Sequence, residues 1–230
     1  VLPLLDDPGR YHKLAPFTDT RPFARAMERK AEHRKEVIAR FGFHPAAPVL
    51  LAVGMMREGD KLASYGVLAE ALGMLSRKAW SLLIVGDGPA RGAVESFFHE
   101  VPSERIGFAG TTAPDGLPGL YAAADLMVWP AINEAFGMAM LEAQATGLPV
   151  VAGRTGGVPD VVHDGETGLL CPVGDTAAFA NTVDRLLAEP GRLKTYSARA
   201  AARASAENDI SAAADALDRI LRSGRKAEAA

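Results

Sequence analysis

The residues LMVWPAINEAFGMAMLEAQATGLPVVAG, from Leu126 to Gly153, hold one complete structural unit. Two short apolar runs, 126–129 and 149–152, are predicted to be buried strands because each is bounded by proline or glycine. A helix is expected between them, from about Phe136 to Thr146, with Gly147 as its C-terminal stop. Strand, helix and strand within fewer than thirty residues form a βαβ unit, so the sheet should be parallel.

The expected helix is apolar almost all round. Its only strongly polar residues are Glu142 and Gln144, and the others are apolar or small, so the helix should be largely buried. A buried carboxylate is costly unless another group satisfies it. Glu134 lies eight residues before Glu142, just outside the helix start. The spacing of these two acids is the first indication of function.

The distance between the two acids limits their chemistry. Eight residues of helix rise about 12 Å. The two carboxyls of a glycosidase lie within roughly 5–9.5 Å of each other, so hydrolysis by this pair fits poorly. A shared metal fits worse, because its ligands must converge on one point. Two acids this far apart suit the two ends of one long ligand.

The helix start lies between the two acids. The free N–H groups of Phe136, Gly137 and Met138 and the positive end of the helix dipole would attract phosphate, and Gly137 would allow close approach. A nucleoside diphosphate sugar has the matching order of sugar, diphosphate and ribose. Glu142 could accept two hydrogen bonds from the ribose diol, while Glu134 would meet the sugar hydroxyls.

The block NEAFGMAMLEAQATGLPVVA, followed by GGVP at 156–159 and HDGETGLL at 163–170, resembles a known family. It is similar to the donor-binding half of retaining GT-B glycosyltransferases of family 4, often called glycosyl transferases group 1. The likeness covers about residues 49–190. It implies that Glu142 holds the ribose, that Glu134 lies beside the donor sugar, and that transfer in the intact enzyme is retaining and metal-independent.

The resemblance also implies cations for the donor phosphates. The family usually has Gly-Arg after the first strand and Lys-Gly a few residues later. Here Met55 occupies the arginine position and Leu62 follows Lys61. Lys61 keeps a spacing compatible with the phosphate lysine, so that role is expected of it. Arg57 is a displaced substitute for the arginine, or else a solvated loop residue.

The other strands are expected at 48–54, 80–85, 105–110 and 169–171. With the central unit they predict a doubly wound, Rossmann-like α/β sheet of six parallel strands in the order 3-2-1-4-5-6, with the ligand at the carboxyl ends between strands one and four. The sequence GDGPARG after the second strand lacks the third glycine of the dinucleotide fingerprint, and a tight turn is expected instead.

In the family, the loop after the third strand lines the base pocket. Gly110 and Thr111 are therefore expected to contact the nucleobase.

Three segments are expected along the chain. Residues 1–47 form an approach segment and a charged helix at 21–40, in which basic residues outnumber acidic ones by seven to three. Two interpretations of this excess of basic residues are possible: the helix is attracted to anionic lipid, or it simply presents a solvated face. Residues 48–190 form the nucleotide-sugar-binding domain. Residues 191–230 form two C-terminal helices, near 191–206 and 210–222, and a tail.

Composition narrows the functional classes. The net charge of −3 offers no case for nucleic-acid binding. The single Cys171 excludes an internal disulfide and fits a reducing, cytoplasmic compartment. No apolar run approaches the ~18 residues of a membrane span. The five histidines lack metal-ligand spacing, so no metal or other cofactor is expected besides the sugar nucleotide. The first residue, Val1, is not an initiator methionine, which suggests trimming or a fragment.

The resemblance implies a partner. GT-B enzymes have two Rossmann-like domains, and this chain has strands for the second only, so it should bind a sugar nucleotide but transfer poorly without an N-terminal acceptor-binding domain. Three alternatives stay open: a sugar-nucleotide epimerase or phosphorylase on a related fold, a non-catalytic domain that binds a sugar nucleotide or another protein, and a Glu142 that is merely an exposed helix residue.

Overall fold

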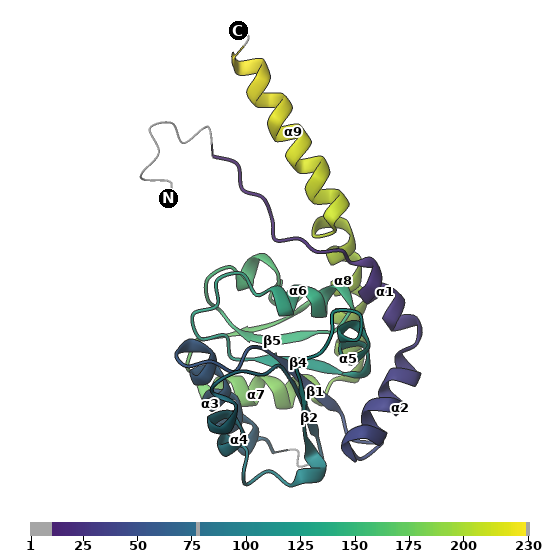
Figure 1. The fold of residues 1–230 in the computed structure, drawn as a ribbon, viewed down its shortest axis with the longest axis vertical. Coiled ribbons are helices and arrows are strands. Elements are labelled where there is room, and N and C mark those ends of the chain that lie inside the picture. Colours follow the sequence, from purple (N-terminus) through teal and green to yellow (C-terminus); the bar gives the residue numbers. More distant parts are fainter. Residues whose placement is uncertain (1–10, 77–78, 229–230) are drawn as a thin grey trace.

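The computed structural model describes residues 11–76 and 79–228, so the first ten residues of the expected approach segment lie outside it. A parallel six-stranded sheet with the order β3-β2-β1-β4-β5-β6 forms its centre (Figure 1). This order confirms the predicted one. The strands are β1 (Val49–Val53), β2 (Ser81–Val85), β3 (Ile106–Gly110), β4 (Leu126–Trp129), β5 (Val150–Gly153) and β6 (Gly168–Cys171).

The four central strands are short apolar runs because helices cover both of their faces. Every residue of β2, β4 and β5 is buried, as are the first four of β1. Leu50 pairs with Leu82 of β2 on one side and with Leu126 of β4 on the other. The chain therefore changes direction across the sheet between β1 and β4, and the carboxyl ends of these two strands flank the crevice that this topology creates.

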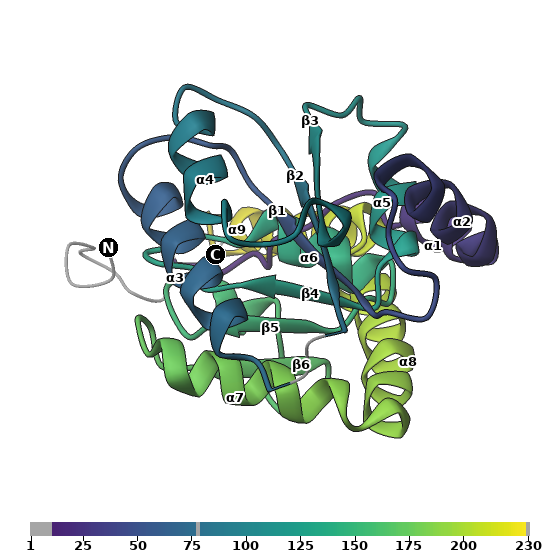
Figure 2. The same ribbon diagram turned by 90° about the horizontal axis from the view of Figure 1, so that it is seen from below.

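Two groups of helices cover the sheet (Figure 2). On one face α3 (Asp60–Met74) packs against α4 (Arg91–Phe97) and α7 (Thr176–Leu187). On the other, α5 (Leu117–Ala123) contacts α6 (Met138–Ala145), and both contact α1 (Arg21–Glu28). Helix α2 (Lys30–Phe41) packs on α5, and α8 (Pro190–Glu207) packs on α6 and α7. The 3-10 turns in the described part of the chain are η3 (Ser103–Arg105) and η4 (Val158–Asp160).

The expected charged helix at 21–40 is in fact two helices. They meet at Arg29, whose backbone leaves the helical region with φ −112° and ψ 23°. The bend allows the buried side chains of both α1 and α2, Phe23 and Val37, to face the same body, and Phe23 packs edge-on against Tyr121 of α5 at 5.9 Å. Packing against α5 therefore overrides the continuous helical pattern of the sequence.

The C-terminal helices also differ slightly from the prediction. Asp175 caps α7 as expected, by accepting a hydrogen bond from the amide of Ala178. Pro190 begins α8, where a missing N–H costs nothing in a first helical turn. The last helix, α9 (Ile210–Glu228), continues beyond the expected end near 222 and extends away from the sheet (Figure 1). Within residues 11–76 and 79–228, no helix is both long and apolar enough to cross a membrane.

The loops at the carboxyl edge pack closely enough to require glycine. Gly86, directly after β2, has φ +134°, and a Cβ there would lie 2.0 Å from the carbonyl oxygen of Gly54 after β1. Only glycine allows these two loops to meet. The sequence GDGPARG is thus the expected tight turn, and α4 begins at its arginine, Arg91.

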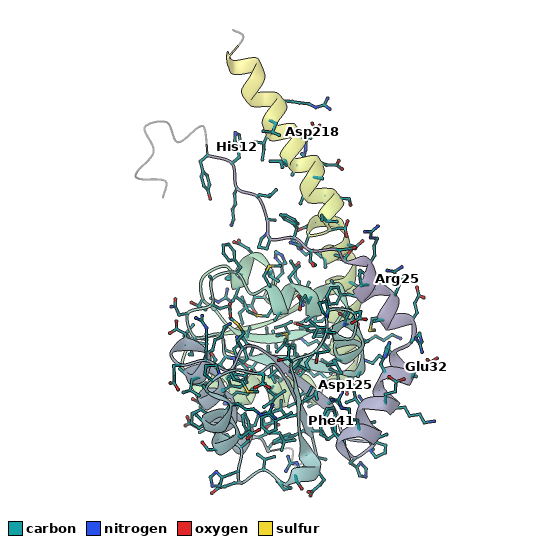
Figure 3. The ribbon with its side chains drawn as sticks, in the orientation of Figure 1. His12, Arg25, Glu32, Phe41, Asp125 and Asp218 are labelled. Carbon is teal, nitrogen blue, oxygen red and sulfur yellow. The ribbon has the colours of Figure 1, made fainter. Side chains whose placement is uncertain are left out.

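Helix α2 is tied to the sheet through Asp125, at the start of β4. Its Oδ2 accepts hydrogen bonds from the guanidinium of Arg34 at 2.6 Å and from the amide of Val49 at 2.9 Å. Arg34 also donates to the carbonyl of Ala47 at 2.8 Å. Figure 3 shows Asp125 beside α2, and shows Asp218 on the projecting α9. Asp125 therefore joins α2, β1 and β4 at the amino edge of the sheet.

We expect Asp125→Ala to lower the free energy of unfolding by about 2–4 kcal/mol, because it removes the charged acceptor of a partly buried guanidinium and the acceptor of a strand amide. Urea unfolding followed by circular dichroism measures this. Asp218→Ala is the matched control, since it removes only an exposed pair with Arg222 on α9 and should change stability by about 0.5 kcal/mol or less. Equal effects of the two substitutions would contradict the anchoring role of Asp125.

Candidate functional site

A cavity of about 660 Å³ lies at the carboxyl edge of the sheet, between the loops that follow β1 and β4. Its walls come from the ends of β1, β2 and β4, the loop after β3, and the start of α6. The lining residues are Val53, Gly54, Met55, Lys61, Val85, Gly86, Asp87, Thr111, Thr112, Leu117, Trp129, Glu134, Ala135, Phe136, Gly137, Met138, Ala139, Met140 and Glu142. The predicted topology thus places most of the predicted site residues, Lys61, Glu134 and Glu142 among them, in one crevice, where doubly wound sheets bind ligands.

Helix α6 points its first turn at this cavity. The helix begins at Met138, two residues later than expected, because Gly137 has a left-handed backbone with φ +76° and ψ 40°. The carbonyl of Gly137 accepts hydrogen bonds from Met140 and Leu141. The amides of Met138 and Ala139 stand in the first turn, before any helix carbonyl can accept from them. They are the donors that a phosphate would meet.

Glu142 lies on the cavity wall and not in bulk solvent. Its Oε2 accepts a 2.7 Å hydrogen bond from the hydroxyl of Tyr121, a fully buried residue of α5. Burial raises the pKa of the Glu142 carboxyl above its ordinary value, and the hydrogen bond from Tyr121 opposes the rise. Burial also raises the pKa of Tyr121 well above its usual range, so this hydroxyl stays a donor. The alternative of an exposed Glu142 is therefore wrong.

Tyr121 is a site residue that the sequence did not reveal, because one tyrosine in a short apolar helix gives no signal of its own. Its partner lies 21 residues away. Only the contact between α5 and α6 brings them together.

Glu134 and Lys61 meet inside the cavity. The Lys61 ammonium lies 2.5 Å from Glu134 Oε2, and both side chains are largely buried. The indole N–H of Trp129, at the end of β4, donates to the same oxygen at 3.2 Å. Trp129 is a second residue that sequence reasoning missed, because a buried aromatic at a strand end is indistinguishable from core. The two residues predicted to be catalytic are thus an ion pair in the free protein.

Positive charge is scarce around the cavity. Lys61 is the one cation among the described residues that line it. Met55 is 61% exposed at its mouth, where it offers no charge. Arg57 is exposed and does not line the cavity, so the structure does not bring it to the predicted phosphate position. The position of Arg57 fits the alternative interpretation, that it is a solvated loop residue.

The part of the cavity lining that follows β3 consists of the neutral side chains of Thr111, Thr112 and Leu117. Gly110 does not line the cavity. It has φ +70° and accepts a hydrogen bond from the amide of Gly86, so it shapes this loop and does not form its surface.

Asp87 also lines the cavity, although the glycine motif around it failed as a fingerprint. Hydrogen bonds from the Gly88 amide and from Arg91 lower the pKa of its carboxyl and hold it charged.

A second, wider hollow of about 900 Å³ lies between α1–α2 and α5. Arginines 25, 29 and 40 line it, but Glu36 and Asp115 line it too. The exposed cations of α1 and α2 alternate with exposed acids, and the large apolar side chains of these helices face inward. This arrangement favours the solvated reading of the charged helix over lipid attraction.

The cavity at the carboxyl edge therefore suits an elongated anionic ligand. Its lining includes Glu142, the Lys61–Glu134 ion pair and the residues at the start of α6. Among the described residues, no group of three His, Cys, Asp or Glu side chains is placed to hold a metal ion.

The family described as Glycosyl transferases group 1 matches residues 47–189. D-inositol 3-phosphate glycosyltransferase of Corynebacterium efficiens is 34% identical over 188 residues, which is 79% of this chain and 43% of that protein. The chain thus spans less than half the length of this relative.

Two solved structures illustrate the likeness in fold. Sucrose-phosphate synthase from Thermosynechococcus elongatus is 28% identical with a TM-score of 0.75, over 92% of this chain and 52% of that one. The Anabaena protein HepE in complex with UDP-glucose is 22% identical with a TM-score of 0.73, over 91% of this chain and 56% of that one. The second likeness shows the fold alone.

The raised pKa of Glu142 predicts how a neutral substitute changes stability with pH. At neutral pH the folded protein partly buries this carboxylate, so Glu142→Gln should stabilise the ligand-free protein. The advantage should shrink as the pH falls through the raised pKa toward the ordinary 4.5, because the wild-type carboxyl is then protonated in the folded state too.

Urea midpoints of the two proteins between about pH 4 and pH 8 measure this difference. Glu100→Gln is the control, because Glu100 is exposed and should give no such trend. A Glu142→Gln variant that is no more stable than wild type at neutral pH, or whose advantage does not depend on pH, would contradict the burial argument.

Proposed function

Because the chain belongs to the glycosyl transferases group 1 family, we propose that it is the donor-binding part of a glycosyltransferase. Its cavity would hold a nucleoside diphosphate sugar, and the intact enzyme would transfer the sugar to an acceptor hydroxyl. UDP-glucose is bound by HepE, which shares this fold, so a nucleotide sugar is a ligand class that the fold accommodates.

The position of Glu142 carries the proposal. A carboxylate on an apolar helix raises the energy of the empty protein, as its raised pKa shows. Tyr121 satisfies one oxygen, Oε2. The other oxygen, Oε1, accepts no hydrogen bond from the residues that the structure describes. A ribose diol would supply donors to this carboxylate and offset its burial.

The remaining parts of the donor follow from that anchor. The diphosphate would lie against the amides of Met138 and Ala139 at the start of α6, where the helix dipole favours negative charge. Lys61 would turn from Glu134 to the phosphates. The base would extend toward Thr111 and Thr112, and the sugar would lie near Glu134.

The proposed chemistry is retaining transfer without a metal. The bond between the anomeric carbon and the diphosphate oxygen breaks, and the acceptor oxygen bonds to the same carbon and loses its proton. The charge that develops on the leaving diphosphate would be stabilised by the Lys61 ammonium and the amides of α6. Glu134 would orient the sugar through its hydroxyls.

Transfer would also require groups that this chain does not supply. The chain covers 43% of D-inositol 3-phosphate glycosyltransferase of C. efficiens and 52% of sucrose-phosphate synthase, so more than half of the first protein and nearly half of the second have no counterpart here. We infer that the missing part binds the acceptor. The chain alone should bind the nucleotide sugar and transfer it poorly.

The test begins with a thermal-shift screen of UDP, GDP and ADP, followed by titration calorimetry of the nucleotide that binds. We expect Glu142→Ala to weaken its affinity by about tenfold or more, because two charge-assisted hydrogen bonds to the ribose are lost. Glu100→Ala, which removes an exposed glutamate, should leave the affinity unchanged. Equal affinities for wild type and Glu142→Ala would count against the proposed function.

A further inference from the structure

The loop from Ala131 to Glu134 is held in an unusual backbone conformation. Ala131 and Asn133 both have positive φ, 55° and 53°, which residues with a side chain rarely adopt. Such conformations are strained and persist only where surrounding contacts enforce them. The loop ends at Glu134, so the same contacts also fix the backbone from which that side chain extends.

The first turn of α3 supplies several of the contacts. The carboxylate of Asp60 accepts a hydrogen bond from the Asn133 side chain at 2.8 Å. The hydroxyl of Ser64 accepts one from the amide of Ile132 at 3.0 Å and donates to the carbonyl of Asp60 at 2.8 Å. The helix that follows β1 therefore holds the loop that follows β4.

Two donors converge on Glu134 Oε2, the ammonium of Lys61 and the indole N–H of Trp129. The two side chains differ in conformational freedom. Lys61 is a flexible side chain whose charge is also proposed to meet the donor diphosphate. Trp129 is 1% exposed, and Tyr65 packs edge-on against it at 5.0 Å. The indole cannot move away, whereas the ammonium can.

We propose that Trp129 is a positioning residue for Glu134. It holds Oε2 in place when Lys61 turns to the phosphates, and so keeps Oε1 directed at the donor sugar. The inference rests on the proposed function. It means that Trp129, a buried residue, helps the site to distinguish a sugar nucleotide from a nucleotide without a sugar.

The first experiment needs no ligand. The chain has two tryptophans, Trp80 and Trp129, so a spectrum of ¹⁵N-labelled protein contains two indole N–H signals, and Trp129→Phe identifies one of them. Replacing the charged acceptor by Glu134→Gln should move the Trp129 signal upfield and leave the Trp80 signal in place. A Trp129 signal that does not move would overturn the proposal.

The second experiment compares UDP with UDP-glucose by calorimetry. Trp129→Phe keeps the buried ring and removes the N–H. We expect its affinity for UDP to stay within about twofold of wild type, while the ratio of its affinity for UDP-glucose to its affinity for UDP falls by about fivefold or more.

Tyr65→Phe is the matched control. Tyr65 is the other ring of the aromatic pair, and its hydroxyl donates to the carbonyl of Gly54 at 2.8 Å. The substitution removes this hydroxyl and should leave the relative affinity for UDP-glucose and UDP as in wild type. An affinity ratio that is unchanged in Trp129→Phe, or that falls equally in Tyr65→Phe, would overturn the positioning role. If wild-type protein bound neither uridine ligand, the proposed function would fail for uridine donors, and the indole signals would still decide whether Trp129 holds Glu134.

Discussion

One carboxylate in an apolar wall, that of Glu142, is the constraint on which the account depends. The helix that carries it packs between the sheet, α5 and α8, so most of its side chains are buried and the acid is partly buried with them. Tyr121 satisfies Oε2 and leaves Oε1 without a partner among the described residues. A group that destabilises the empty protein, and that lies beside open helix amides, is typical of a binding site and not of a core.

The sheet topology explains why residues distant in sequence share this cavity. Because β1 and β4 are neighbours, the loops after them meet at the carboxyl edge. Lys61 and Glu134 are 73 residues apart, yet they form an ion pair there. The same neighbourhood lets the first turn of α3 hold the loop that presents Glu134. The cavity is therefore built by the contact between two halves of the sheet, and neither half contains it alone.

Local sequence patterns were sufficient to predict the features that depend on the spacing of apolar residues and on the positions of turn-forming residues. The strand order and the cap at Asp175 follow from apolar runs and turn residues, and the structure confirms them. The spacing of Glu134 and Glu142 suggested one site, and both residues line the same cavity. What the sequence could not predict depends on tertiary contacts. The partners of the two glutamates, Tyr121 and Trp129, come from elements that look like ordinary core. The late start of α6 follows from the left-handed backbone of Gly137, and the sequence does not distinguish a glycine before a helix from one in its first turn.

The most direct measurement of the central claim removes the hydroxyl that Glu142 is proposed to bind. The affinity of the protein for the nucleoside diphosphate that it binds is compared with its affinity for the 2′-deoxy form of that nucleotide. Both affinities are measured for wild type and for Glu142→Gln. The account predicts a loss of affinity for the deoxy form in wild type that nearly disappears in the variant, because the two changes remove the same interaction. An equal loss in both proteins, or no loss in wild type, would show that Glu142 does not contact the ribose, and the account would be wrong.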